Sequence, residues 1–514
     1  MDAVETPYDT VLYPSHPLPQ THPDRLATIA GHYGVAPAPA TRCRVLELGC
    51  GVGGNLAAMA YQHPGSEFVG IDLSGRSIAI GRQNVAELGL ANVRLEHCGI
   101  DEITPDFGTF DYIVAHGVYS WVPAAVREKM WEIFARNLAP QGVAYVSYNA
   151  LPGSRFRDAA RDIMLYHVRA MSDPAEKIRE GRAIVGLIAA LVPQEEGYAR
   201  VLAEQLDRLN GMSDEVVFHD DLDAGATAFL FHDVVAEAGR HGLQYLSEAR
   251  FAQSHLGLMP GYVARLLDRF PPDAALEREQ YLDFLACRSF RQTLLCHAAV
   301  ALDRTVGPDC VRLHYLAGHL VPEEGVADPA GAGAARYRTT RGVALVADRP
   351  LVKAAALVLG ERWPEAVAFG DLVAAAAARL PGGAAPSEAE VDALAAALFR
   401  AYAAEQVDMH LYPPRLTKAV TERPEASLIA RQLSESGSVI VNLRHARVTI
   451  EDDVARRFLR LLDGTRDRAA LMTDLADALA ASPSAGAAAP TITAEGVERN
   501  LALLASLGLL VAPA

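Results

Sequence analysis

Residues 44–55 read RVLELGCGVGGN and combine an apolar strand with a glycine-rich turn. The turn contains Gly49, Gly51 and Gly53, and a helical pattern follows it over residues 55–62. Glycine allows a backbone to turn tightly and to come close to a ligand. The free amides at the start of the next helix also face such a ligand. The stretch therefore predicts a strand, a ligand-binding turn and a helix.

Short apolar runs alternate with amphipathic segments on both sides of this turn, from Arg42 to Tyr148. Strands are expected at 44–48, 67–71, 92–97, 110–115 and 142–148, and helices at 55–62, 74–88 and 123–138. Such alternation is typical of an α/β fold, in which helices cover both faces of a doubly wound, mostly parallel sheet. We therefore expect a Rossmann-like domain in this part of the chain.

An acidic residue, Asp72, ends the second expected strand in the segment FVGID. A carboxylate at this position can accept hydrogen bonds from both hydroxyls of a ribose. Gly49, Gly51 and Gly54 also fit the GxGxxG spacing of dinucleotide-binding loops. Three features disfavour a dinucleotide: Glu47 stands two residues before the glycines, about forty residues precede the strand, and no second nucleotide-binding half follows. A turn of this kind without a ligand is the remaining alternative.

Composition limits the kind of protein. With 514 residues, half of them apolar, the chain is too long for one core, and several domains are expected. A net charge of −16 without a dense Lys/Arg run disfavours nucleic acid as a partner. The six cysteines form no CxxC pair and no zinc-like spacing, which predicts reduced thiols and no metal.

The sequence carries no membrane signal. The N-terminus, MDAVETPYDT, lacks the apolar segment of a signal peptide. The longest apolar stretch, AIVGLIAALV at 183–192, is too short to cross a bilayer and is expected to form a buried helix. A cytoplasmic protein that does not bind membranes is therefore predicted.

After residue 153 the patterns are mainly helical. Helices are expected over 154–210, 229–239 and 276–303, a strand at 243–246, a β segment at 337–348, and linkers at 322–335, 381–386 and 482–490. Two strands over 438–450 followed by two helical stretches are typical of a winged-helix-like module.

Several segments together resemble a bacterial family. They are YDTVLYPSHPLPQTHPDRLATIA (8–30), CRVLELGCG (43–51), GIDLS (70–74), FDYIVAHGVYSWVP (110–123), GVAYVSYNALPG (142–153) and EQYLDFLACRSFRQTLLCH (279–297). The family is that of class I S-adenosylmethionine-dependent methyltransferases with a methyltransferase regulatory domain. It includes protein-lysine methyltransferases that modify rickettsial outer-membrane proteins.

The resemblance implies a domain division. We expect an N-terminal arm or lid at 1–40, a methyltransferase core at 41–153, and a helical insertion that is a candidate dimerisation element at 154–215. They would be followed by a regulatory-domain-like region that completes the core at 216–305, a middle domain at 306–400, and a winged-helix-like domain at 401–514. The helical insertion could instead serve packing within one chain, and the N-terminal arm could instead lie on the surface.

The resemblance also implies S-adenosyl-L-methionine as cofactor, with S-adenosyl-L-homocysteine as product. Asp72 would hold the ribose, and Leu73 would pack on the adenine. Gly99 stands where relatives often have an acid for the adenine amino group, so backbone groups of Gly99 and Ile100 are expected to replace it. The full set of expected cofactor-binding residues is Arg25, Glu47, Gly49, Gly51, Gly53, Asn55, Asp72, Leu73, Gly99, Ile100, Asp101, His116 and Gly117.

The acceptor is expected beside the ends of the fourth and fifth strands, where ligands bind in such sheets. Aromatic walls suit a cationic amine. The expected acceptor-pocket and catalytic residues are His116, Tyr119, Trp121, Tyr148 and Asn149, and the alternative for each ring is a place in the core. Arg25 would pair with the methionine carboxylate.

Three functions follow from these features. The first is N-methylation of protein lysine side chains, since no NPPY-type motif of amide and DNA-base methyltransferases is present. The second is methylation of a small molecule, because family membership does not fix the acceptor. The third is a non-catalytic S-adenosylmethionine-binding regulatory protein. A homodimer is expected through the helical insertion.

Overall fold

The computed structural model describes residues 6–193, 195–253, 261–271, 274–325, 328–340, 342–382, 385–480 and 492–513. The chain forms two compact units. The first contains residues 1–15, 35–60 and 65–302, and the second contains residues 16–34, 61–64 and 303–514. The expected linker at 482–490 lies outside the described residues. Positions 326–327 of the expected linker 322–335 and positions 383–384 of the expected linker 381–386 also lie outside them.

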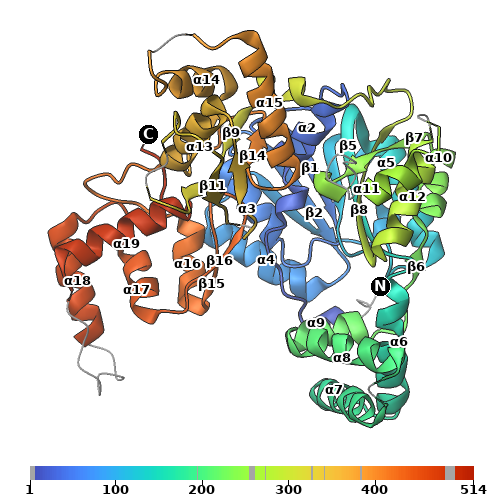
Figure 1. The fold of residues 1–514 in the computed structure, drawn as a ribbon. Helices are drawn as coiled ribbons and strands as arrows, with labels where there is room; N and C mark the ends of the chain where they lie inside the picture. The colour runs from blue at the N-terminus through green and yellow to red at the C-terminus, as the bar shows by residue number, and fades with distance from the viewer. Residues whose placement is uncertain are drawn as a thin grey trace. The chain divides into compact units, whose positions relative to one another are not determined.

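The first unit is built on an eight-stranded sheet with the order β3-β2-β1-β4-β5-β8-β7, and β6 pairs with β5 (Figure 1). The first five strands are parallel, whereas β8 is antiparallel to β5 and β7 is antiparallel to β8. The strands are β1 (Arg44–Leu48), β2 (Glu67–Asp72), β3 (Val93–His97), β4 (Phe110–Ala115), β5 (Leu138–Ala150), β6 (Ala228–Phe229), β7 (Leu243–Glu248) and β8 (Phe290–His297).

Helices cover this sheet, and the expected α/β class is confirmed. The helices are α3 (Gly54–Gln62), α4 (Gly75–Glu87), α5 (Ala124–Asn137), α10 (Phe231–Arg240), α11 (Gly261–Leu267) and α12 (Ala275–Ala286). Trp131 and Phe134 of α5 and Val234 of α10 are fully buried against strand residues such as Val146. The buried area drives these amphipathic helices onto the sheet.

The expectation of one long helix at 276–303 was wrong. Helix α12 ends at Ala286, Cys287 adopts a left-handed conformation with φ of +47°, and β8 follows. Strand β8 lies between β5 and β7, so Leu294, Leu295 and Cys296 are all buried. A strand covered on both faces shows a continuous apolar run, which periodicity alone does not distinguish from a buried helix.

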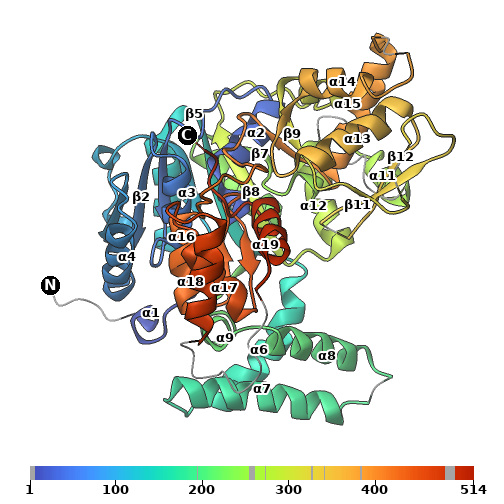
Figure 2. The same ribbon diagram turned by 90° about the vertical axis from the view of Figure 1, so that its left-hand side faces the viewer.

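A helical bundle follows β5 in the chain. It consists of α6 (Ser154–Val168), α7 (Pro174–Leu191), α8 (Gly197–Asn210) and α9 (Asp214–Asp221), and Figure 2 shows its helices side by side. The stretch 183–192 was expected to be a buried helix; it is helical up to Leu191, as expected, but it is only partly buried. Val185 is buried in the bundle, but Leu187 is 57% exposed and Leu191 is 73% exposed. Only one face of α7 packs within the bundle.

The leader is divided between the two units. Helix α1 (Pro7–Thr10) belongs to the first, whereas η1 (Pro19–Thr21) and α2 (Pro23–His32) belong to the second. The expected N-terminal arm or lid over residues 1–40 stays a prediction.

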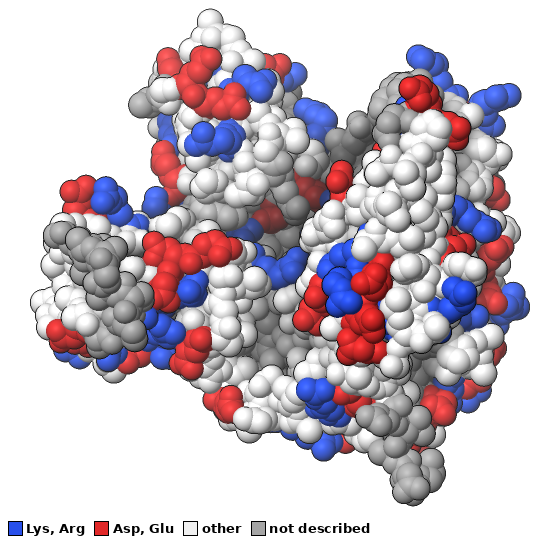
Figure 3. Space-filling model, turned by 90° about the horizontal axis from the view of Figure 1, so that it is seen from below, with Lys and Arg blue, Asp and Glu red and all other residues white. Residues whose placement is uncertain are grey.

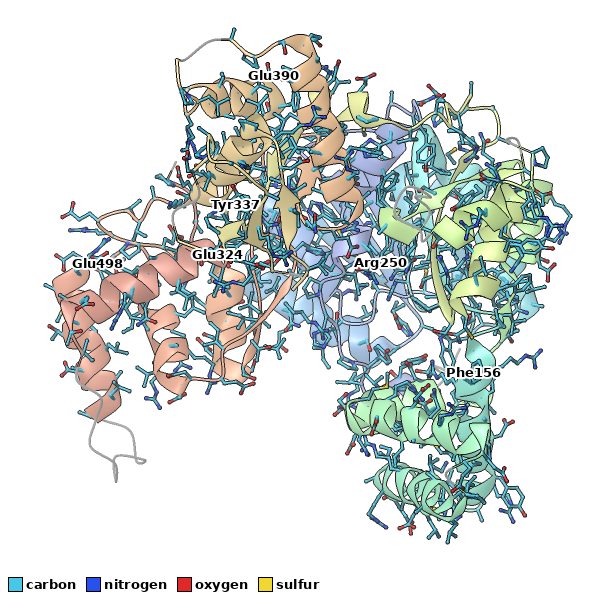
Figure 4. The ribbon with its side chains drawn as sticks, viewed as in Figure 1. Phe156, Arg250, Glu324, Tyr337, Glu390 and Glu498 are labelled. Atoms are coloured by element: carbon cyan, nitrogen blue, oxygen red, sulfur yellow. The ribbon has the colours of Figure 1, made fainter. Side chains whose placement is uncertain are left out.

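The second unit contains two small three-stranded sheets with helices around them. The sheets are β13-β9-β14, from Val367–Ala368, Tyr315–Ala317 and Asp408–His410, and β10-β11-β12, from Val321–Pro322, Ala335–Arg338 and Leu345–Ala347. The helices are α13 (Pro350–Arg362), α14 (Phe369–Ala377) and α15 (Glu388–Ala403). Tyr337, labelled on β11 in Figure 4, is fully buried and donates to the Lys353 carbonyl.

The chain ends in a winged-helix module. Its elements are α16 (Leu428–Ser436), β15 (Val439–Val441), β16 (Arg447–Thr449), α17 (Asp453–Leu461), α18 (Arg468–Ala480) and α19 (Ala494–Ser506). Ile440, Leu471 and Leu501 lie in its separate apolar core. Among the described residues of the whole chain, no helix is both long and apolar enough to cross a membrane.

Candidate active site

The glycine loop lies at the carboxyl end of β1. Gly51 has a φ of +56°, and a β-carbon added there would meet no atom within 4 Å. Gly49 has a φ of +73°, and a β-carbon there would lie 2.6 Å from Cγ2 of Val118 in the loop after β4. Side chains are strained in this conformation. The loop is therefore open to a ligand at Gly51 and closely packed against the end of β4 at Gly49.

Glu47 lies beneath this loop and carries an unsatisfied oxygen. The side chain is 4% exposed, and its Oε1 accepts a hydrogen bond from Nδ2 of Asn55 at 2.9 Å. Its Oε2 is buried and has no hydrogen-bond partner in the structure. Burial raises the pKa of this carboxyl to about 8. A cationic group bound at the loop would compensate the buried carboxylate, which fits the ammonium or sulfonium of S-adenosylmethionine.

Asp72, at the end of β2, faces the same loop. Its Oδ2 accepts from the Gly51 N–H at 2.8 Å, and its Oδ1 accepts from the Ser74 N–H at 2.8 Å. Each carboxylate oxygen has a further lone pair for a ribose hydroxyl. Burial raises the pKa of Asp72. The next residue, Leu73, is 55% exposed, so its apolar surface is available to a flat ring.

After β3, an acidic side chain lies close to Gly99, the position at which relatives often have an acid for the adenine amino group. The Gly99 N–H donates to Oε1 of Glu102 at 2.7 Å, in the first turn of the short helix η2 (Ile100–Glu102). A β-carbon at Gly99 would lie 2.3 Å from Oδ1 of Asp101. The Asp101 carboxylate therefore lies against Gly99, although it comes two residues later in the sequence. The adenine-binding role of Gly99, Ile100 and Asp101 stays a prediction.

The end of β4 is fixed by hydrogen bonds from β5. Nδ1 of His116 lies 2.8 Å from the Tyr145 hydroxyl, and the Gly117 N–H donates to Oγ of Ser147 at 2.8 Å. Burial lowers the pKa of His116 to about 4, so its imidazole is neutral near pH 7. Tyr145 and Ser147 were not predicted from the sequence, although both stand in the expected fifth strand and share one face of it with Asn149.

Two of the expected acceptor-pocket rings lie in the core. Tyr119 and Tyr148 are fully buried. The Tyr119 hydroxyl donates to Oε2 of Glu237 at 2.9 Å, and the Tyr148 hydroxyl lies 3.1 Å from Oγ1 of Thr293. Neither ring offers surface to an acceptor, so the expectation for these two residues is corrected: they support the sheet.

Two other expected acceptor residues remain accessible. Trp121 and Asn149 are partly exposed, and the Asn149 N–H donates to Oγ of Ser120 at 2.8 Å. Asn149 stands at the end of β5, and Trp121 lies in the connection between β4 and α5. Their roles, with that of His116, stay predictions.

Residues 8–15 contact the same edge of the sheet. Oδ1 of Asp9 accepts from Oγ of Ser74 at 2.7 Å, and Oγ of Ser15 accepts from the Gly54 N–H at 3.1 Å. Between these points the Tyr8 ring stacks on His219 of α9, with centroids 4.3 Å apart. The leader is thus attached to the segment after Asp72 and to the start of α3.

Arg25 has a partner in the second unit. Its guanidinium lies 3.7 Å from the Glu405 carboxylate. Pairing of Arg25 with the methionine carboxylate therefore stays a prediction. No group of three or more His, Cys, Asp or Glu side chains suited to a metal ion occurs within the described part of the chain.

Comparison with known families identifies three domains in this order. A model described as a methyltransferase domain matches residues 45–142, one described as a predicted methyltransferase regulatory domain matches 213–297, and one described as the PKMT C-terminal winged helix domain matches 422–496.

Two relatives come from Rickettsia prowazekii, and both are uncharacterized proteins. The protein RP789 is 38% identical over 323 residues, which are 63% of this chain and 58% of the relative. The protein RP028 is 34% identical over 240 residues, which are 46% of this chain and 96% of the relative. The chain thus spans somewhat more than half of the first relative and almost all of the second.

A solved structure shares the fold. PKMT2 from Rickettsia typhi, determined in complex with AdoHcy, superposes with a TM-score of 0.86 at 24% identity, covering 97% of this chain and 100% of that chain. Taken together, the glycine loop with Asp72, the matched domains and the rickettsial relatives show that the chain belongs to the class I S-adenosylmethionine-dependent methyltransferases that carry a methyltransferase regulatory domain.

Proposed function

We propose that this protein transfers methyl groups from S-adenosylmethionine to lysine side chains of a protein. The observation that carries the proposal is the winged-helix domain of PKMT type at residues 422–496, on the same chain as the methyltransferase domain at 45–142. Domains outside the methyltransferase core give an enzyme of this class additional surface with which to bind a polypeptide. The shared fold of PKMT2 is consistent with this function.

The cofactor would be held by the edge formed by β1, β2 and β3. The open space at Gly51 would admit it, the lone pairs of Asp72 would bind the ribose hydroxyls, and Leu73 would cover one face of the adenine. Glu47 would compensate positive charge near the methionine end. Asp101, which lies against Gly99, is available for the adenine amino group.

Bound S-adenosylmethionine supplies a methyl group on a sulfonium, which makes the methyl carbon open to attack by an amine. The lysine ammonium must first lose a proton to solvent. Its nitrogen lone pair then forms the new N–C bond as the C–S bond breaks, leaving S-adenosylhomocysteine and a methylammonium. The chain's contribution is to align the amine with the methyl and to limit water, and such positioning can supply much of the rate increase. Partial burial lowers the pKa of the lysine, so a strong general base is not required.

A homodimer through the helical bundle is part of the proposal. Leu187 and Leu191 of α7 and Tyr166 of α6 are exposed apolar side chains, and Phe156, labelled in Figure 4, is another at the start of α6. A partner copy would bury this surface. The view in Figure 3 shows uncharged surface between small clusters of both signs. The exclusion of nucleic acid and the cytoplasmic location stay predictions.

The test is incubation of the full chain with methyl-labelled S-adenosylmethionine and candidate proteins, followed by mass spectrometry of labelled peptides. We expect label on lysine nitrogen and its loss in Asp72→Ala, whereas Asp106→Ala, at an exposed position outside the site, keeps it. Label only in small molecules would contradict a protein acceptor and favour a metabolite methyltransferase. Absence of S-adenosylmethionine binding by calorimetry would instead favour the non-catalytic alternative.

A further inference from the structure

The strand ends beside the site follow one another along the sheet in the order β1, β4, β5 and β8. His116 follows β4, Asn149 stands near the end of β5, and Phe290 begins the antiparallel β8 opposite Asn149. Neighbouring strands are about 4.8 Å apart, so the start of β8 lies three spacings, about 14 Å, from the strand that bears the glycine loop. This length of sheet edge can hold a methyl donor and an acceptor side by side.

The start of β8 is held rigidly. Arg291 is fully buried, and its guanidinium pairs with the carboxylates of Glu248, Asp283 and Glu279 at 2.6, 2.8 and 3.0 Å. In the preceding turn, the Ser289 carbonyl accepts from the Ala150 N–H of β5 at 2.9 Å. Phe290 stands between these two anchors, so its backbone position is fixed relative to the end of β5.

The Phe290 ring has exposed surface, unlike the two buried tyrosine rings at this edge of the sheet. It is 36% exposed, whereas Tyr119 and Tyr148 are fully buried. It lies edge-on to the His116 imidazole, with centroids 5.9 Å apart and planes at 75°. His116 in turn precedes the loop whose Val118 packs against Gly49. A series of contacts therefore runs from the glycine loop to Phe290.

We propose that Phe290 forms the apolar wall of the acceptor site and determines its preference for a lysine side chain. This inference rests on the proposed lysine methyltransferase function. The methylene groups of lysine would pack on the ring, and the ring face would attract the amine while it is charged. The region matched by the regulatory-domain model, 213–297, would thereby complete the acceptor site of the methyltransferase domain.

The test compares Phe290→Ala with a matched control, Phe284→Ala. Phe284 has a similarly exposed ring, but it lies on α12. Initial rates are measured with the protein acceptor that the wild type labels, and binding of S-adenosylmethionine is measured by calorimetry. We expect the KM for the acceptor to rise about tenfold in Phe290→Ala, because a buried apolar contact is lost. The Kd for S-adenosylmethionine should stay within about twofold of the wild type, and both values should stay unchanged in the control.

Two further variants distinguish loss of the contact between Phe290 and the acceptor from a change in how the protein folds. Phe290→Leu keeps apolar volume without a π face and should give an intermediate KM, whereas Phe290→Tyr should stay near the wild-type value. Equal KM values for wild type, Phe290→Ala and Phe290→Leu would overturn the inference and leave the proposed function intact. A parallel loss of S-adenosylmethionine binding in Phe290→Leu would also overturn it, since the role would then be structural. Absence of lysine labelling by the wild type would instead contradict the proposed function.

Discussion

Replacement of Arg291 tests how the start of β8 is held. Its guanidinium is fully buried and pairs with the carboxylates of Glu248, Glu279 and Asp283, while Phe231 packs against it with the ring centroid 3.9 Å from Cζ. Arg291→Met would leave these carboxylates buried without their shared cation. Removing one member of a buried ion pair costs about 3–5 kcal/mol. With a urea slope of about 2–3 kcal/mol/M, the midpoint should fall by about 1–2.5 M.

The assay is urea unfolding of the full chain, followed by tryptophan fluorescence. Trp121 and Trp131 lie in the first unit and Trp363 in the second, so a Trp363→Phe background makes the signal report the first unit. The control is Arg179→Met, which removes a surface pair with Glu180 and should cost less than about 1 kcal/mol. Adding Glu248→Gln to Arg291→Met should recover part of the loss, because one uncompensated charge is removed. Equal midpoints for Arg291→Met and Arg179→Met would refute the argument.

Three other predictions concern the site and the bundle. Burial raises the pKa of Glu47 to about 8, so between about pH 4.5 and pH 8 the folded chain keeps a proton that the unfolded chain releases. The free energy of unfolding should therefore fall as pH rises through this range, and the urea midpoint should depend less on pH in Glu47→Gln. The same pH dependence in Glu47→Gln and in the wild type would contradict the raised pKa of Glu47. Asp9→Ala removes the acceptor of the Ser74 hydroxyl and the Arg76 N–H, so amide exchange should speed up over residues 6–15, with Asp106→Ala as the unaffected control. Leu187→Glu with Leu191→Glu should convert a dimer to a monomer in sedimentation, whereas Glu180→Lys on the same helix should not; a wild-type monomer would contradict the dimer.

The sequence allowed the core of the first unit to be predicted because its signals are local. Alternating apolar runs predicted β1 to β5, and glycine spacing with Asp72 predicted the loop that lies at their carboxyl edge. The contact between Asp101 and Gly99 was not predictable, since it depends on how η2 turns back after β3. Likewise, burial of Tyr119 depends on α10, which supplies Glu237 from more than a hundred residues away. Position after a strand indicates an edge of the sheet, but not whether a side chain points into the core.

The α12–β8 segment shows why the direction of a side chain relative to the sheet matters for function. The stretch 276–303 has apolar residues that fit a helix, and only its partners β5 and β7 make 290–297 a strand. Once it is a strand, Arg291 points into a buried carboxylate cluster, and its neighbour Phe290 points toward the opposite face of the sheet, as alternation requires. The same change of secondary structure that was missed from the sequence therefore places an exposed ring beside His116. A helix over these residues would have put Phe290 and Arg291 about 100° apart on one surface and would have given no reason to connect the regulatory region with the acceptor.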